Sequence, residues 1–139
     1  MPMSSSSIDL TSLRKVLAQL TEALAFWHGC AEGDALKPHL RSAVIQSFEF
    51  TYELAVRNTR RVLIERAESA DLVTDLSFSD LLRRALDAGL PMQLDTWRHW
   101  RDMRNATSHA YDENRANEVA LAAAGFVADV DLLLKALEA

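Results

Sequence analysis

Hydrophobic residues recur near the start of the chain at alternating spacings of three and four positions. The series consists of Leu10, Leu13, Leu17, Leu20, Leu24 and Trp27. This spacing places the side chains on one face of an α-helix, as in a helix that packs along its neighbours. Ser7 or Asp9 is positioned to cap the start of this helix, and the two glycines of "GCAEGD" predict its end. Residues 1–6 are expected to be disordered.

The rest of the chain also has helical spacing, with no alternating strand pattern. The predicted helices run from near Pro38 to about Ser69, from Ser77 or Ser79 to Gly89, from Asp95 to Ser108, and from Asn114 to Leu137. The last helix repeats the apolar seam through Val119, Ala123, Phe126, Val130, Leu133 and Leu137. The pattern predicts an all-α fold, an antiparallel four-helix bundle with an additional short helix, as one domain over residues 1–139.

The segment "RNATSHAY", Arg104 to Tyr111, concentrates polar chemistry at the predicted end of the fourth helix. It holds a guanidinium, a carboxamide, two hydroxyls, an imidazole and a phenol. Asn105 and His109 share one helix face, whereas Arg104 and His109 lie about 140° apart on a helix. So dense a set of proton-transfer and phosphate-binding groups predicts a cleft beside a helix end.

Composition and charge limit the possible classes of protein. The net charge of −5 argues against a protein that coats nucleic acid through bulk electrostatics. A single cysteine, Cys30, cannot form an internal disulfide, which favours a reducing compartment. The start lacks the features of a signal peptide, and no apolar run approaches the ~20 residues that span a bilayer. These features predict a cytoplasmic protein that is not inserted in a membrane.

Arginines are clustered although lysines are few. One cluster contains Arg57, Arg60 and Arg61, and the other contains Arg98, Arg101 and Arg104. The planar guanidinium suits bidentate contact with phosphate, so Arg57, Arg98 and Arg101 are candidates for contact with a nucleotide or RNA. The alternative is that these arginines lie on solvated helix faces and form surface ion pairs.

Several common motifs are absent from the sequence. No Gly-rich phosphate loop follows a strand, and the four histidines lack the spacing of a zinc site. We therefore expect no cofactor and no metal ion. The aromatic residues of "FEFTY" with Trp97 and Trp100 are expected in the core or an interface, and Asp112 and Glu113 are positioned to cap the last helix.

Two stretches carry a resemblance to a known family. "AVIQSFEFTYELA" and "RNATSHAYDENRA" resemble the nucleotidyltransferase substrate-binding proteins, small helical bundles of the HEPN group that are usually encoded beside a minimal nucleotidyltransferase. The resemblance covers roughly Leu40 to Val130, and "SDLLRRALDAGL" fits the short middle helix of the family. Arg104, His109 and Tyr111 match the Arg-x4-His-x-Tyr pattern of HepT-type toxins, with Asn105 directly after the arginine.

The resemblance implies two alternative functions, both with a cognate minimal nucleotidyltransferase as partner. In the first, the chain is a toxin, a metal-independent endoribonuclease with Arg104, Asn105 and His109 as catalytic residues and RNA as substrate. The partner would then neutralise it by transferring AMP to Tyr111. In the second, the chain is a non-catalytic subunit that presents a nucleotide or other substrate to the nucleotidyltransferase. The complete motif favours the first function, and the acidic net charge favours the second.

The apolar faces also predict how the chain assembles. The seams at both ends of the chain and the "FEFTY" stretch offer more apolar surface than one small bundle readily covers. We therefore expect a homodimer with the Arg104–His109 segments near the two-fold axis, and the resemblance implies a site shared by two subunits. The structural alternative is that Arg104 and His109 only connect a helix end to its neighbour.

Overall fold

The computed structural model describes residues 8–139, and this part of the chain contains helices and no strand. Its helices are α1 (Thr11–Gly29), α2 (Lys37–Arg66), α3 (Phe78–Asp87), α4 (Leu94–Ala106) and α5 (Glu113–Glu138), with 3₁₀ turns η1 (Ala70–Leu72) and η2 (Thr107–His109). The predicted all-α fold with one short additional helix is confirmed. The disorder predicted for residues 1–6 lies outside the described residues.

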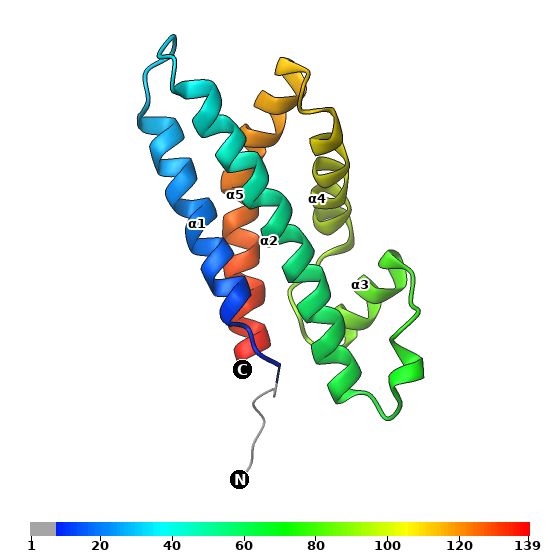
Figure 1. Ribbon diagram of the computed structural model, residues 1–139. Helices are drawn as coiled ribbons and strands as arrows, with labels where there is room; N and C mark the ends of the chain where they lie inside the picture. The colour runs from blue at the N-terminus through cyan, green and yellow to red at the C-terminus, as the bar shows by residue number, and fades with distance from the viewer. Residues whose placement is uncertain (1–7) are drawn as a thin grey trace.

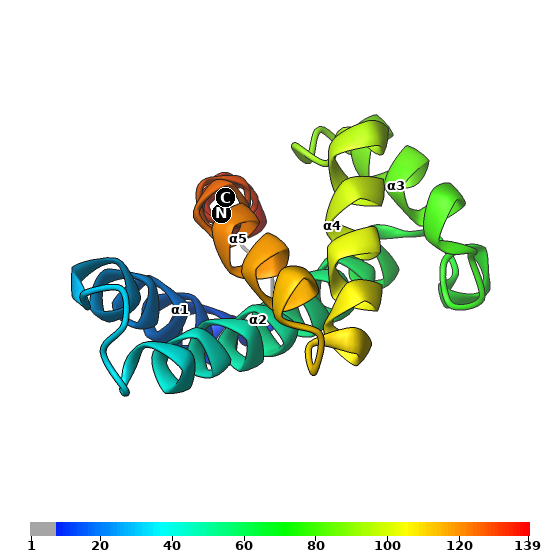
Figure 2. The same ribbon diagram turned by 90° about the horizontal axis from the view of Figure 1, so that it is seen from above.

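The helices pack around the long helix α2. Helices α1, α2 and α5 contact one another along the bundle, and α4 contacts both α2 and α5 (Figure 1). Seen from above, α1 and α4 lie on opposite sides of the α2–α5 pair, and α3 lies beyond α4 (Figure 2). None of the helices in residues 8–139 combines the length and the apolar character needed to cross a bilayer.

The core is built from the apolar seams that the sequence pattern identifies. Every residue of the two seams, on α1 and α5 and including Leu10 just before α1, is buried within one chain. Phe126 on α5 is the centre of an aromatic cluster, with ring centroids 4.7 Å from Phe48, 5.9 Å from Trp97 and 5.2 Å from Trp100. Edge-to-face rings at these distances stabilise a core beyond their buried area. The predicted core placement of both tryptophans is confirmed.

This packing changes the argument for a homodimer. The two seams are covered inside one chain, so they leave no apolar stripe for a second copy. The large apolar side chains that do remain exposed are Phe26, Leu36, Phe50, Leu72, Tyr111, Leu121 and Leu132. Of the "FEFTY" stretch only Phe50 is exposed, while Phe48 and Tyr52 are buried. The homodimer itself stays a prediction.

Side-chain caps fix the ends of the helices near the site. The Ser77 hydroxyl accepts a hydrogen bond from the Asp80 backbone N–H and begins α3. The Asp112 carboxylate accepts from two backbone N–H groups and begins α5, as the sequence predicts. Helix α1 has no side-chain cap at its N-cap residue, Leu10, although Asp9 accepts from the Thr11 N–H at 2.9 Å. The alternative cap, Ser7, lies outside the described residues.

Candidate functional site

The predicted polar segment begins in the last turn of α4 and leaves the helix at once. The Thr107 hydroxyl lies 2.6 Å from the Arg104 carbonyl oxygen, and the Ser108 hydroxyl donates to the Asn105 carbonyl at 2.8 Å. Hydroxyls that bind carbonyls of the last turn compete with the backbone ladder and favour a helix end. The chain tightens there into η2, so Arg104 is helical, His109 ends the 3₁₀ turn and Tyr111 follows it.

Arg104 is bound to α2 by two carboxylates. Its Nη2 donates to Glu53 Oε1 at 2.6 Å, and its Nη1 lies 3.3 Å from Glu49 Oε2. Nη1 also donates to the Thr107 hydroxyl at 2.9 Å. Glu49 and Glu53 are one helical turn apart, so they face the same neighbour. These charge-assisted contacts fix the guanidinium against α2 and leave one excess negative charge beside it.

Sequence reasoning missed the acidic partners of Arg104. Glu49 and Glu53 belong to the stretch "FEFTYE", whose aromatic residues and family resemblance we interpreted without assigning a role to its acidic residues. Their spacing of four residues places both carboxylates on one face of α2 and was the available signal. It did not reveal which arginine would meet them, because that depends on how α4 packs against α2.

His109 and Tyr111 lie together at the solvent-exposed end of the segment. His109 Nδ1 is 3.4 Å from the Tyr111 hydroxyl oxygen, and the ring centroids are 6.0 Å apart. A separation of 3.4 Å is longer than a strong hydrogen bond. His109 is exposed, and Tyr111 is 86% exposed. Both rings are therefore accessible to a substrate or to another protein.

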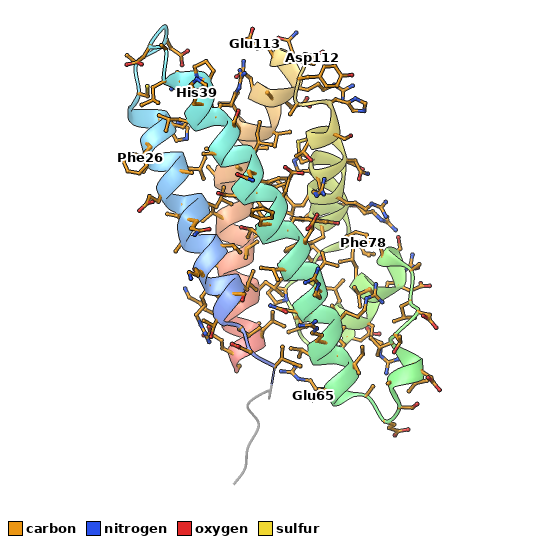
Figure 3. All side chains as sticks on the ribbon, in the orientation of Figure 1. Phe26, His39, Glu65, Phe78, Asp112 and Glu113 are labelled. Carbon is orange, nitrogen blue, oxygen red and sulfur yellow. The ribbon has the colours of Figure 1, made fainter. Side chains whose placement is uncertain are left out.

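The segment does not form a closed triad in one chain. Within residues 8–139, neither Arg104 nor the exposed Asn105 makes a side-chain hydrogen bond with His109. The guanidinium is turned to α2, and the imidazole lies with Tyr111 close to the start of α5, at the end of the molecule where Figure 3 labels Asp112 and Glu113. Because His109 lies beyond α4 in the turn η2, the shared helix face predicted for Asn105 and His109 is not formed.

A second phenol, that of Tyr52, is packed in the core against Phe126, with ring centroids 6.5 Å apart. Tyr52 on α2 is buried, and its burial raises its pKa to about 12. The charges of Arg101 and Arg104 act in the opposite direction and lower this pKa. Because burial is the larger effect, Tyr52 stays neutral at neutral pH.

Two of the candidate arginines contact α3. Arg98 Nη2 donates to the Ser79 hydroxyl at 3.2 Å, and the Arg101 guanidinium lies 4.8 Å from the centroid of the Phe78 ring. Both side chains are partly exposed. They join α3 to α4 and remain partly accessible to solvent.

The first arginine cluster divides in a similar way. Arg60 Nη1 donates to the carbonyls of residues 73, 74 and 76 and so holds the loop before α3. Arg60 therefore has a structural role, but through backbone carbonyls and not through the surface ion pairs of the alternative. Arg57, the predicted nucleotide contact, is exposed on α2.

A hollow of about 350 Å³ adjoins the anchored arginine. Its walls come from α2, from the segment after α4 and from the start of α5, and they include Arg41, Gln46, Glu49 and Thr107. The last two residues are also partners of Arg104. In residues 8–139, no group of three His, Cys, Asp or Glu side chains is arranged to hold a metal ion.

The family follows from comparison with known sequences. Residues 8–139 match a family model described as "Nucleotidyltransferase substrate binding protein like". The chain belongs to this family. The match extends over all the described helices, and it confirms the family that the two sequence stretches indicated.

Two relatives from Haemophilus influenzae support this membership. The chain is 39% identical over 98 residues to a protein named "Probable ribonuclease HepT", a match that covers 70% of this chain and 67% of that protein. It also superposes on the structure of HI0074, described as the fold of a substrate binding domain of a nucleotidyltransferase, with a TM-score of 0.86 and 30% identity. That match covers 94% of this chain and all of the other, so the two chains share one fold over this part.

Proposed function

We propose that this chain is the helical partner of a minimal nucleotidyltransferase and is an endoribonuclease that the partner neutralises. The observation that carries the proposal is the exposed His109–Tyr111 pair, in which Nδ1 and the hydroxyl oxygen are 3.4 Å apart. The pair lies in the same segment as Arg104, which is bound to α2. A relative named as a ribonuclease and a family named for substrate binding to nucleotidyltransferases support the two halves of the proposal.

The cleavage needs one proton acceptor, one proton donor and a cation. The ribose 2′-oxygen attacks the adjacent phosphorus, its proton is removed, a 2′,3′-cyclic phosphate forms, and the bond from phosphorus to the 5′-oxygen breaks. The leaving 5′-oxygen then takes up a proton. The His109 imidazole supplies one of these proton transfers, and the guanidinium of Arg104 stabilises the charge that develops on the phosphoryl oxygens.

The experiment is an RNA cleavage assay with excess EDTA. The full chain is expected to produce 2′,3′-cyclic phosphate ends, and His109→Ala should reduce the rate by about 10²- to 10⁴-fold. His99→Ala is the matched control because it removes another exposed histidine, which lies on α4 and outside the turn that carries His109. Equal loss in both variants, or cleavage that depends on added metal, would contradict the mechanism.

Neutralisation would occur at Tyr111. Its hydroxyl oxygen attacks the α-phosphorus of ATP, the bond to pyrophosphate breaks, and the phenolic proton passes to His109 or to solvent. The partner enzyme supplies ATP and magnesium. The adduct places a phosphate and a base beside the imidazole and blocks RNA. Mass spectrometry after incubation with the partner should find AMP on the Tyr111 peptide of the wild-type chain, and this chain should lose RNA cleavage as the adduct forms. The Tyr111→Phe variant should carry no AMP.

The proposed assembly places two such segments together. A homodimer with its axis near the Arg104–His109 segments would supply an arginine from one subunit near the histidine of the other, which fits their separation within one chain. Arg57, Arg98 and Arg101 would then contact more distant phosphates. Light scattering at micromolar concentration tests the dimer, and gel filtration after co-expression tests the nucleotidyltransferase complex.

One observation favours the alternative, a non-catalytic substrate-binding subunit. Glu49 and Glu53 already neutralise Arg104, which weakens its attraction for phosphate. Under this alternative the chain binds its partner and a nucleotide but leaves RNA intact. The alternative would be supported if the chain forms the complex with the nucleotidyltransferase, carries no AMP on Tyr111 and does not cleave RNA.

A further inference from the structure

The hollow beside Arg104 has the chemistry of a site for one nucleotide. Its floor is apolar and buried, formed by Ile45 on α2 and Ala116 on α5. Its rim carries hydrogen-bonding groups, the Ser42 hydroxyl and the Gln46 carboxamide, both exposed on α2. An apolar base plane with a polar edge matches this arrangement, and about 350 Å³ is within the range of ligand pockets.

Arg41 supplies the cation of the hollow and has donors to spare. Its side chain is only 16% exposed, and its Nη1 donates to Asn117 Oδ1 at 3.0 Å. The ion pair with Glu113 is loose, at 3.9 Å, and the Glu113 side chain is 80% exposed. Arg41 Nε is buried without a hydrogen-bond partner. A guanidinium has five N–H donors, and the two on Nη2 make no hydrogen bond within residues 8–139, so they are available for a phosphate.

The carboxylate in the wall of this hollow is already paired with a cation. Glu49 is the acidic residue in its wall, and it is already paired with Arg104 and lies 3.2 Å from the Thr107 hydroxyl. A second, larger hollow is also lined by Arg41, but it has more acidic residues in its wall, namely Glu32, Asp34 and Glu113.

The lysine that lines the larger hollow, Lys37, is already bound to other groups of the protein. The Lys37 ammonium donates to the carbonyls of Trp27 and Cys30 at the end of α1 and pairs with Glu32. The larger hollow is therefore a poor site for phosphate.

The hollow is continuous with the reactive segment. Thr107 and Ala110, which line it, are in the same turn as His109. Arg41 lies eight residues before Glu49 on α2, about 12 Å along a helix with a rise of 1.5 Å per residue. Because residues of the His109 turn line the hollow, a strand of RNA whose scissile phosphate sits at His109 would place a neighbouring nucleotide there.

We propose that this hollow is a subsite for the RNA nucleotide next to the cleaved bond, with Arg41 on its flanking phosphate and Gln46 and Ser42 on the edge of its base. The subsite rests on the proposed ribonuclease function. It adds an arginine outside the Arg104–Tyr111 segment and a source of base preference at one position.

The test is fluorescence anisotropy with short single-stranded oligoribonucleotides on the full chain carrying His109→Ala, so that binding is separated from cleavage. Adding Arg41→Gln should weaken binding about tenfold or more, as for a lost charge-assisted contact. It should also lower the slope of log affinity against log salt by about 0.7, the value for one phosphate on a single strand. Arg41→Lys should keep that slope and recover part of the affinity.

Two further variants separate the subsite from general effects. Arg83→Gln is the matched control, because Arg83 pairs with Asp80 on α3, away from the hollow, and should leave binding unchanged. Ser42→Glu places a carboxylate on the exposed rim, where the fold tolerates it, and should weaken binding even if Arg41→Gln proves unstable. Gln46→Ala should relax base preference at one position without changing the salt slope.

The outcomes distinguish the subsite from the ribonuclease proposal. Unchanged affinity and salt slope in both Arg41→Gln and Ser42→Glu would overturn the subsite, whether or not the wild-type chain cleaves RNA. RNA binding that depends on Arg41 in a chain without cleavage activity would support the subsite and contradict the ribonuclease. A chain that binds no RNA at all would overturn both.

Discussion

Arg104 and the His109–Tyr111 pair, at the two ends of one short segment, are held in opposite ways. Arg104 contacts Glu49, Glu53 and Thr107, whereas His109 and Tyr111 contact each other and solvent. The anchored end is part of the packing between α2 and α4, while the exposed end is free to meet a ligand. Residues of one motif can therefore differ in role: Arg104 contributes to the packing of the fold, whereas His109 and Tyr111 are accessible for chemistry.

The largest expected effects are on RNA cleavage and on stability, and they distinguish Arg104 from His109. His109→Ala and Arg104→Ala should each reduce RNA cleavage by about 10²-fold or more, because each removes a group needed in the transition state. Only Arg104→Ala should also destabilise the fold, by about 1 kcal/mol, since it leaves two carboxylates unpaired in a partly exposed place. Urea denaturation of both variants measures this difference. A similar loss of stability in His109→Ala would show that the exposed end also supports packing.

A second prediction sharpens the role of the acidic pair. If Arg104→Ala is destabilising because of repulsion between Glu49 and Glu53, then Glu49→Gln and Glu53→Gln in the same chain should restore most of the lost stability. The expected recovery is about 0.5 kcal/mol or more, measured as a shift of the urea midpoint at constant slope. Cleavage should stay low, because the guanidinium is still missing.

A third prediction concerns the restraint that Glu53 places on Arg104. Glu53→Gln keeps a hydrogen-bond acceptor for Nη2 and removes one negative charge beside the proposed phosphate position. On the His109→Ala background it should tighten RNA binding by about twofold to fivefold, as expected for a partly exposed charge pair. The gain should shrink as salt is added. Weaker binding in this variant would indicate that Glu53 orients the guanidinium more than it neutralises it.

The smallest effect distinguishes the two tyrosines of the chain. Tyr52 is buried with its pKa raised to about 12, and Tyr111 is 86% exposed. The folded state disfavours the Tyr52 phenolate. The stabilisation from the protonated phenol is therefore complete below the ordinary tyrosine pKa near 10, and it is lost as the pH rises through 12. An absorbance titration should show one late-ionising tyrosine that disappears in Tyr52→Phe. Tyr111→Phe should change stability by less than about 0.5 kcal/mol.

The helices were largely predictable because their signals are local. The three- and four-residue spacing of apolar positions identifies α1 and α5, and Ser77, Asp112 and Gly89 mark helix limits through caps and turns. The predicted end of the fourth helix at Ser108 was two residues too late, because the hydroxyls of Thr107 and Ser108 bind carbonyls of the last turn. Short-range hydrogen bonds of this kind compete closely with the helix, and spacing alone does not resolve them.

By itself, the sequence determined the all-α class, the core faces of α1 and α5, the family and the polar segment from Arg104 to Tyr111. Each of these depends on residue type at short separation along the chain. Only the tertiary structure decided that Arg104 pairs with Glu49 and Glu53, that Arg101 packs on Phe78, and that Arg41 reaches a hollow next to Thr107. Those contacts join residues on different helices, and they depend on the packing of α4 and α5 against α2, which no local pattern encodes.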